Sequence, residues 1–345
     1  MPDGSSPNGV GSLPLAAVIV NWNGGDRLLR CVESLLESRP APAEILVVDN
    51  GSRDGSPQRV ADLDGVAVVD TGSNVGFAGG ANAGARATTA PIILFLNPDV
   101  RFEPDAPGAL VRAFEDPHVG VAGPELRNPD GTLQNRGIVI DPTGHPVGAE
   151  DDAVFFVSGC ALAVRRELFE LLRGFDDDYF MFAEDLDLCW RAQLVGRRVA
   201  AVPDAVAFHD GGASIAGGYL DQGPLRTNVT RLYLRERNTL AAVLTNYGSG
   251  RALSVAALRA LMALGEALVF AIRGRPDASR AYVRALAWVA RHAPALAAKR
   301  RRVQASRVVS DRALVGVVPR FVKLDVVRTA GIPSLDAPSP RRDGR

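Results

Sequence analysis

The sequence predicts an α/β fold with a mostly parallel β-sheet between helices, followed by a region that is wholly helical. Two observations support this. Continuous apolar, β-branched runs recur through the first hundred residues and alternate with stretches of helical periodicity. Unbroken apolar runs are typical of parallel strands that are buried on both faces. From Arg251 onward, long apolar and amphipathic helical patterns replace the strand patterns.

Four apolar runs predict the strands of the first half, at residues 15–20, 44–49, 66–70 and 92–96. Apolar residues at helical spacing predict helices between them, at 26–38, 56–62 and 77–88. The later patterns predict strands at 155–157, 161–164 and 198–202, and helices at 165–172 and 184–195, the last ended by Gly196. Because a helix follows each early strand, the sheet must be mostly parallel and covered on both faces.

The charge of the chain is divided between two regions, although the net charge is zero. Residues from Arg251 onward include 19 basic and 6 acidic side chains, and the preceding residues include 20 basic and 33 acidic ones. An acidic catalytic part with a basic tail is the simplest division. Three cysteines without a CxxC pair predict buried thiols in a reducing cytoplasm and argue against a disulfide framework or a zinc ribbon.

Shifts in composition divide the chain into five segments. The polar segment 1–13 is a predicted disordered leader without a signal peptide, so we expect a cytoplasmic protein. The other segments are a catalytic α/β domain at 14–215, a flexible loop and connecting helix at 216–250, a basic helical region at 251–302 and a partly disordered tail at 303–345.

Polar side chains directly follow three of the predicted strands. Asn21 and Asn23 follow the first, Asp49 ends the second, and Asn97-Pro-Asp99 follows the fourth. Ligands of open α/β sheets bind beyond this edge. A carboxylate such as Asp49 can accept hydrogen bonds from a base or a ribose, although Asp-Asn-Gly-Ser is also a favourable turn sequence.

Two further patterns predict contacts with a diphosphate. Small residues between Asn74 and Asn82, among them Gly76, open a helix and would let its backbone approach an anion. Close helix–sheet packing explains the glycines but not the asparagines. Asp99, and His209 after the last strand, are candidates for holding a divalent cation, with a β-turn and a structural histidine as the alternatives.

The densest signal is an acidic and aromatic segment at residues 174–191. Glu184, Asp185 and Asp187 fall near the start of a predicted helix, where acids stabilise the helix dipole. That role does not explain their aromatic neighbours. A carboxylate held among aromatic rings is suited to removing the proton of an acceptor hydroxyl.

Together these motifs resemble the family 2 inverting glycosyltransferases, which have the GT-A fold, and among them the rhamnosyltransferase-like branch. The resemblance covers about two-thirds of the chain. The matching motifs are Val18-Ile-Val-Asn-Trp-Asn-Gly24, Val47-Val-Asp-Asn-Gly-Ser52, Asn74-Val-Gly-Phe-Ala78, Leu96-Asn-Pro-Asp99, Ser158-Gly-Cys160, Gly174-Phe-Asp176 and Glu184-Asp-Leu-Asp-Leu-Cys-Trp-Arg191.

The resemblance implies roles for individual residues. Asp185 would be the general base. Asp99 corresponds to the last acid of the metal-binding D-x-D element, in which Asn97 replaces the first acid, and His209 corresponds to a later metal or diphosphate contact. The implied cofactor is therefore Mg²⁺ or Mn²⁺. The candidates for nucleotide-sugar binding are Asn21, Asn23, Asp49, Asn74, Gly76, Asn82, Asn97 and Glu184.

The resemblance also implies the substrates. They are dTDP-rhamnose as donor and a lipid-linked or cell-envelope saccharide as acceptor, with a UDP- or GDP-sugar as the alternative donor. A dinucleotide-dependent oxidoreductase shares the alternating pattern, but the missing GxGxxG counts against it. A non-catalytic nucleotide-sugar-binding membrane scaffold would have no need of Asp185. The segment with Arg237 and Asn238 resembles one in relatives, but no role follows from it.

The basic helical end predicts peripheral contact with the anionic inner face of the plasma membrane. Residues 252–272 are long enough to span a bilayer, but Arg259 and Glu266 interrupt them on one helical face, which favours a packed or surface-lying helix. A helix at 278–298 is amphipathic, and the cluster Lys299-Arg-Arg-Arg302 follows it. A helical hairpin packed on the catalytic domain is the alternative. No aromatic interleaving accompanies the charge, so nucleic acid is not an expected partner.

Overall fold

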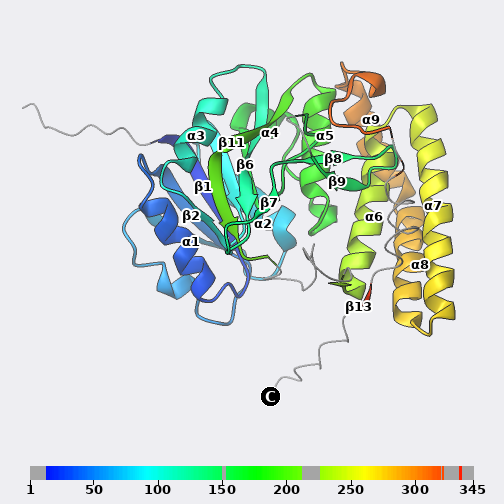
Figure 1. Ribbon diagram of the computed structural model, residues 1–345, viewed down its shortest axis with the longest axis horizontal. Helices are drawn as coiled ribbons and strands as arrows, with labels where there is room; N and C mark the ends of the chain where they lie inside the picture. The colour runs from blue at the N-terminus through cyan, green and yellow to red at the C-terminus, as the bar shows by residue number, and fades with distance from the viewer. Residues whose placement is uncertain (1–12, 150–152, 212–225, 320, 322–333, 336–345) are drawn as a thin grey trace, which may run out of the picture.

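The computed structural model describes residues 13–149, 153–211, 226–319, 321 and 334–335. A twisted sheet lies between helices, and a bundle of long helices packs against one side of this layered part (Figure 1). Most of the predicted leader, of the glycine-rich segment 211–223 and of the tail beyond 321 lies outside the described residues.

The central sheet combines a parallel half with a mixed half. Its strands are β1 (Leu13–Asn21), β2 (Pro42–Asp49), β3 (Val66–Asp70), β4 (Ile92–Leu96), β5 (Val100–Phe102), β6 (Val119–Arg127), β7 (Leu133–Asn135), β10 (Ala161–Arg165) and β11 (Arg198–His209). Their order is β3-β2-β1-β4-β10-β6-β11-β5, with β7 beside β6. The pairs among β3, β2, β1 and β4 are parallel, whereas β10 runs antiparallel to β4 and β6. The parallel half is the part that the sequence predicts.

Helices cover both faces of this sheet. They are α1 (Asp26–Leu36), α2 (Gly76–Arg86), α3 (Ala106–Ala113), α4 (Arg166–Leu171) and α5 (Glu184–Leu194). Alternate side chains of the central strands point to opposite faces. Val18 and Phe95 therefore join the core beneath α2, α4 and α5, and Ile19 and Leu94 join the core beneath α1 and α3. All four side chains are fully buried, so the expected covering of both faces is confirmed.

Four long helices and small accessory strands complete the described fold. The helices are α6 (Val229–Asn246), α7 (Ser249–Ile272), α8 (Pro276–Arg291) and α9 (Ala293–Ala305). The accessory strands form two pairs, β8 (Ile138–Ile140) with β9 (Pro146–Gly148) and β12 (Arg226–Thr227) with β13 (Ser334–Leu335). α6 packs against α5 on one side and α7, α8 and α9 on the other, so it joins the bundle to the layered part.

Four expectations need correction. The apolar run 155–157 is not a strand: its residues are buried in the core, and Phe156 makes one isolated bridge to Ile138. The expected helix at 56–62 is a single 3-10 turn at Pro57–Arg59. β11 continues to His209 rather than ending at 202. The helix expected at 278–298 is two helices, because the turn at His292 separates α8 from α9 and Pro294 lies in the first turn of α9.

Candidate active site

The loops after β1 and β2 hold one another through polar side chains. Asn21 is fully buried, and its Nδ2 donates to the hydroxyls of Ser52 and Ser56, both at 3.0 Å. Asn23 is exposed, and its Oδ1 accepts from the Arg53 amide at 2.8 Å. The structure thus brings these two predicted residues together beyond the strand ends and uses them to shape the loop between Ser52 and Ser56.

Asp49 lies at the same edge of the sheet. Its Oδ1 accepts from the amide of Ser52 at 2.9 Å, which is the turn alternative that the sequence allows. The side chain is only half-buried, so the second carboxylate oxygen remains available for a ligand. Turn formation and ligand binding are therefore compatible at this residue.

The start of α2 packs against the backbone of Phe180, in the acidic loop before α5. Gly76 has φ +79°, and an added Cβ would lie 2.3 Å from the carbonyl oxygen of Phe180, so only glycine fits this close approach. Asn74 Oδ1 accepts from the Gly76 amide at 2.9 Å, and the Ala78 amide donates to Phe180 at 3.2 Å. This helix start therefore carries the acidic loop that precedes α5.

Asn82 also supports that loop. Its Nδ2 donates to the Phe175 carbonyl at 2.9 Å and to Asp177 Oδ1 at 2.7 Å, while its Oδ1 accepts from the Phe175 amide at 3.0 Å. Both ends of the amide are satisfied by residues 93 and 95 positions away. These contacts give Asn82 a supporting role in the loop, and its contact with the nucleotide sugar stays a prediction.

Asp99 and His209 lie side by side, as expected for a cation site. His209 Nε2 is 3.5 Å from Asp99 Oδ1, and this buried oxygen has no hydrogen-bond partner among the described residues. Gln134 Oε1 lies 2.8 Å from His209 Nδ1 and can only accept, so the neutral ring carries its proton there. Its Nε2 lone pair then faces a carboxylate, and such a pair of acceptors fits a divalent cation.

These two residues are not a complete metal site. Within the described residues, no three side chains of His, Cys, Asp or Glu gather where they could hold a metal ion. Mg²⁺ is commonly bound by one or two carboxylates with the remaining ligands supplied by water and substrate phosphates. The donor set therefore suits a cation that arrives with a diphosphate.

Glu184 and Asp185 begin α5 as a coupled acid pair. Asp185 Oδ2 accepts from the Gly159 amide at 2.8 Å, and its Oδ1 accepts from the Leu186 amide at 2.7 Å. Burial raises the pKa of Asp185, and these amides oppose the rise. Burial and the adjacent Asp185 charge raise the pKa of Glu184 well above its usual range, and Glu184 Oε2 has no partner among the described residues.

The amide hydrogen bonds make Asp185 the member of the pair that ionises first, because they stabilise its carboxylate form. Asp187 has a different role. Its two oxygens bind Arg191 Nε at 2.7 Å and Asn246 Nδ2 at 2.9 Å, and the residue is 3% exposed. Asp187 is thus held in a buried ion pair with Arg191, whereas backbone amides are the donors to Asp185, so we exclude Asp187 as a base.

The segment Ser158-Gly159-Cys160 connects the acid pair with the cation candidates. Gly159 binds Asp185, and the Cys160 carbonyl accepts from the Asn97 amide at 2.9 Å. Burial and the charges of Asp99 and Asp185 raise the pKa of Cys160 to about 12. Both carboxylates therefore lie within electrostatic reach of one thiol, and the structure brings Asp99 and Asp185 to one site.

Comparison with known proteins gives this site a family. Residues 16–173 match Glycosyl transferase family 2. The chain is 31% identical over 238 residues to the N-acetylglucosaminyl-diphospho-decaprenol L-rhamnosyltransferase of Mycobacterium tuberculosis, covering 56% of this chain and 75% of that protein. The chain belongs to glycosyl transferase family 2. It is therefore a glycosyltransferase, as the sequence motifs predict.

Other relatives of this glycosyltransferase support the same assignment. The O-antigen chain rhamnosyltransferase RfbN of Salmonella typhimurium is 26% identical over 212 residues, which cover 57% of this chain and 66% of that protein. The solved structure of the mannosyltransferase PcManGT from Pyrobaculum calidifontis has a TM-score of 0.53 at 20% identity and covers 83% of this chain and 90% of its own. That of Staphylococcus aureus TarS 1–349 has a TM-score of 0.54 at 15% identity, with coverages of 85% and 88%. The fold is therefore GT-A.

The role of Arg237 and Asn238 in this glycosyltransferase could not be read from the sequence. Asn238 on α6 is 1% exposed, and its Nδ2 lies 2.7–2.9 Å from three carbonyl oxygens of the loop before α5. These carbonyls belong to Tyr179, Met181 and Phe182. Arg237 Nη2 donates to two carbonyls of the same loop, at 2.8 Å.

That loop needs such support because its backbone is strained. Phe180, Phe182 and Ala183 all have φ between 63° and 68°, a region that costs an ordinary residue about 1 kcal/mol or more. The next residues are Glu184 and Asp185. Asn238 and Arg237 are therefore positioning residues for the acid pair.

Arg235, one turn earlier on α6, is a second group that the sequence motifs left without a role. Its positive charge lowers the pKa of Asp185, so the guanidinium lies within electrostatic reach of the acid pair. Within the described residues, it makes no hydrogen bond or ion pair of its own. A half-buried cation next to the acid pair and without a protein partner is suited to contact an anionic substrate group.

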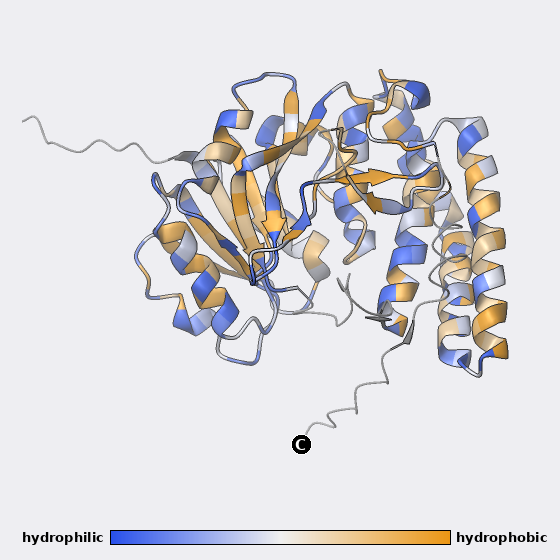
Figure 2. Cartoon of the chain, in the orientation of Figure 1, coloured by the Kyte–Doolittle hydropathy of each residue, from blue (hydrophilic) through white to orange (hydrophobic). Residues whose placement is uncertain are grey.

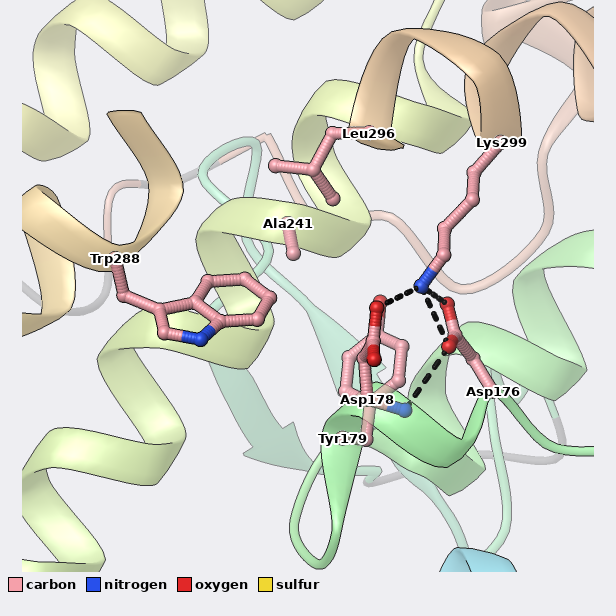
Figure 3. A pocket seen from close by; sticks show the side chains of 7 residues that line it. All are labelled: Asp176, Asp178, Tyr179, Ala241, Trp288, Leu296 and Lys299. Atoms are coloured by element: carbon pink, nitrogen blue, oxygen red, sulfur yellow. Dashed lines mark hydrogen bonds and ion pairs between the residues drawn. The ribbon is translucent and has the colours of Figure 1, made fainter. Parts of the chain in front are cut away.

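α9 contacts the acidic loop from the opposite side. Lys299 Nζ lies 2.6 Å from carboxylate oxygens of Asp176 and Asp178. Figure 3 shows the lysine and both acids together on one side of a small pocket, with Trp288 on the opposite side and Leu296 between. Arg300 donates to backbone carbonyls at the end of α6. Two of the four residues in the predicted polybasic cluster therefore face the protein, and only Arg301 and Arg302 are exposed.

Proposed function

We propose that this glycosyltransferase moves rhamnose from dTDP-rhamnose to a hydroxyl group of a lipid-linked or cell-envelope saccharide, with inversion at the anomeric carbon. The acid pair at the start of α5 carries the proposal. Asp185 combines a raised pKa with amide hydrogen bonds that keep its carboxylate the more acidic of the pair, which suits a general base near neutral pH. Two relatives are named as rhamnosyltransferases, and this supports the choice of sugar.

In the proposed step, Asp185 takes the proton of the acceptor hydroxyl. The hydroxyl oxygen then forms a bond to the anomeric carbon while the bond from that carbon to the diphosphate oxygen breaks. The electron pair of the broken bond leaves with the diphosphate. Because attack and departure occur on opposite sides of the carbon, its configuration inverts.

The rest of the site would bind the donor and offset its charge. Asp49, with the loop that Asn21 and Asn23 shape, lies where a nucleoside would bind beyond β1 and β2. Asp99 and His209 would hold a divalent cation, Mg²⁺ or Mn²⁺, which when bound offsets the negative charge that develops on the leaving diphosphate. Arg235 would add a positive charge from α6.

We propose that the enzyme works in the cytoplasm at the inner face of the plasma membrane, where it meets the lipid-linked acceptor. One relative is named for an acceptor on decaprenol diphosphate. In this proposal residues 14–215 are the catalytic domain, and the basic helical region 251–302 faces the membrane.

The deciding experiment measures transfer from a panel of donors to a water-soluble analogue of a lipid-diphosphate saccharide. We expect turnover with dTDP-rhamnose and an inverted linkage in the product by NMR. Turnover with a UDP- or GDP-sugar instead would assign the alternative donor. No transfer from any donor that the protein binds would favour a binding protein and overturn the enzymatic proposal.

A parallel measurement tests the cation. Excess EDTA should weaken binding of the nucleotide diphosphate by at least roughly tenfold, because the diphosphate would lose the positive charge that offsets its own. Asp99→Asn should reproduce that loss, with Asp105→Asn, an exposed acid nearby in the chain, as the control. Equal affinity with and without EDTA would leave Arg235 as the main charge-neutralising group.

A further inference from the structure

α7 carries its charged side chains on the inside. Between Ala252 and Ile272 it has two charged residues, Arg259 and Glu266. Arg259 is 4% exposed, donates to the Thr143 carbonyl at 2.9 Å and pairs with Glu236 of α6 at 2.9 Å. Glu266 is half-buried and hydrogen-bonds the Tyr282 side chain of α8. The charges that seem to interrupt the apolar run therefore belong to the packed side of the helix.

The outer face of α7 is left without charge and rich in large apolar side chains. Its exposed large residues recur every three, four or eight positions along one side of the helix, at 50–76% exposure: Leu253, Leu261, Leu264, Leu268 and Ile272. Figure 2 shows the apolar colour along this outermost helix. A surface helix of a water-soluble protein has the reverse pattern, with its apolar stripe toward the core.

The length of α7 adds to this contrast. Among the described helices it is the one long and apolar enough to cross a membrane, and only 28% of its most apolar stretch is buried in the protein. The core helix of a soluble protein of similar hydropathy would be mostly buried. The described residues therefore leave the apolar face of α7 without an occupant.

The charges on α7, α8 and α9 favour an anionic lipid surface, rather than a second copy of the chain, as the occupant of the apolar face of α7. From Ser249 to Ala305 there are eleven basic residues and two acidic ones. The two acids are taken, Glu266 by Tyr282 and Asp277 by Arg275 at 3.0 Å. The exposed charged side chains on α7, α8 and α9 are all arginines: Arg273, Arg280, Arg284, Arg291, Arg301 and Arg302. Two copies would bring like charges together, whereas anionic headgroups would neutralise them.

The end of α7 with this face also lies near the acidic loop. Leu232, close to the start of α6, packs with Phe270 at the end of α7 and with Tyr282 of α8. One residue earlier on α6, the guanidinium of Arg231 lies 5.0 Å from the ring centre of Phe182, two residues before the acid pair. The first turn of α6 therefore connects the end of α7, and any surface that this end contacts, to the loop before the acid pair.

We propose that α7 lies flat on an anionic bilayer, with its leucine face among the acyl chains and the neighbouring arginines at the level of the headgroups. The docking surface is therefore the apolar face of α7 supported by exposed arginines, Arg301 and Arg302 among them, whereas Lys299 and Arg300 of the predicted cluster bind the protein itself. This inference rests on the proposed function only for the purpose of docking. Docking would let the saccharide of a lipid-linked acceptor reach Asp185 while its lipid stays in the membrane.

The test compares vesicle binding of the full chain and its variants by co-sedimentation. Leu261→Gln/Leu264→Gln/Leu268→Gln should lower partitioning onto phosphatidylglycerol vesicles by roughly a hundredfold, since each buried leucine contributes about fivefold or more. Leu264→Gln alone has a matched control in Leu171→Gln, because Leu171 on α4 is 64% exposed and outside the bundle. Arg301→Ser/Arg302→Ser should cost up to about fivefold per residue, and that loss should vanish at high salt.

Activity toward the water-soluble acceptor separates this inference from the proposed function. The triple variant should keep its turnover with that acceptor, because the outer face of α7 contacts none of the site residues, and lose it with acceptor in vesicles. Transfer absent from the parent chain, with vesicle binding intact, would overturn the proposed function and leave the docking surface standing. Vesicle binding that the triple variant retains would overturn the docking surface.

A second measurement does not depend on binding strength. The three native cysteines are buried, so Leu264→Cys can be labelled selectively with an environment-sensitive dye, with Leu171→Cys as control. Dye emission at position 264 should shift to the blue on vesicles, and emission at 171 should not. An unchanged spectrum at 264 would overturn the proposal. So would a dimer in light scattering that the triple variant disperses, since that assigns the face to a second copy.

Discussion

α5 and α7 both bury charged residues, but the buried charges differ in whether they have partners. In α5 every residue except Asp185 is buried, and Glu184 keeps an oxygen without a hydrogen-bond partner among the described residues. In α7 the buried Arg259 binds a carboxylate and a carbonyl. A buried ion pair can hold two elements together, whereas an unpaired buried carboxylate costs stability and is retained for chemistry. The partners of a buried charge therefore distinguish the site from its support.

Removing the base gives the sharpest test of that distinction. Asp185→Asn should lower turnover by at least the roughly hundredfold typical of a lost general base, while donor affinity in calorimetry stays within about twofold. Glu170→Gln, which changes an exposed acid on α4, is the matched control. Near-normal turnover of the Asn variant would exclude Asp185, and Glu184 would then be the remaining candidate, because Asp187 is held in an ion pair with Arg191.

Removing the paired charge should act on stability instead. Arg259→Met removes the buried guanidinium that binds Glu236 and the Thr143 carbonyl, so we expect a loss of about 3 kcal/mol in the free energy of unfolding by urea denaturation. Arg273→Met, at the exposed end of the same helix, should change it by less than about 0.5 kcal/mol. Equal stability of the two variants would show that the buried pair contributes nothing to holding α7.

Asn238 is a buried group with hydrogen-bond partners, and it supports the acid pair, in which Glu184 has an oxygen without a partner among the described residues. Asn238→Ala frees three loop carbonyls, and we expect kcat to fall between ten- and a hundredfold because the acid pair loses its position. The donor KM should change by less than about threefold. A purely structural role would lower stability and leave kcat of the folded fraction unchanged, and that result would contradict the assignment.

The smallest expected effect is a shift of the pH profile. Asp185 acts as a carboxylate, so activity should fall as the pH drops through its raised pKa. The Arg235 charge lowers that pKa, so Arg235→Gln should move the acidic limb of kcat to higher pH. Arg112→Gln, an exposed arginine on α3, should leave the limb in place. A limb that moves to lower pH would show that Arg235 does not act on the base.

The parallel half of the sheet could be predicted because its strands are unbroken apolar runs. The same rule failed at 155–157, where an apolar run lies in the core without pairing as a strand. Residues 103–149 gave no prediction. Their longest strand, β6, contains Gly123 and Pro124, which interrupt the pattern, and the other strands of this stretch, β7, β8 and β9, are three residues long. Pairing with distant strands, which local pattern cannot report, decides such segments.

The candidate site was predictable where chemistry depends on a side chain at a strand or helix end. Asp99 and His209 lie together as expected, and Asp185 is half-buried and held by amides. Asn82 and Asn238 were not predictable in the same way. Their side-chain amides bind backbone atoms more than fifty residues distant. Because every residue type has the same backbone groups, the sequence at the bound position does not reveal such a contact.

The loop from Asp176 to Ala183 has one further consequence, for how relatives of this enzyme could be recombined. It is held by α2 from one side and by α6 and α9 from the other, through Gly76, Asn238 and Lys299. The stretch matched by the family ends at residue 173, just before this loop. A chimaera joined there, or after β11, would pair the acid loop of one parent with the supporting helices of another. The loop must therefore be exchanged together with α6 and α9, although Lys299 is 53 positions beyond Asn246, the last residue of α6.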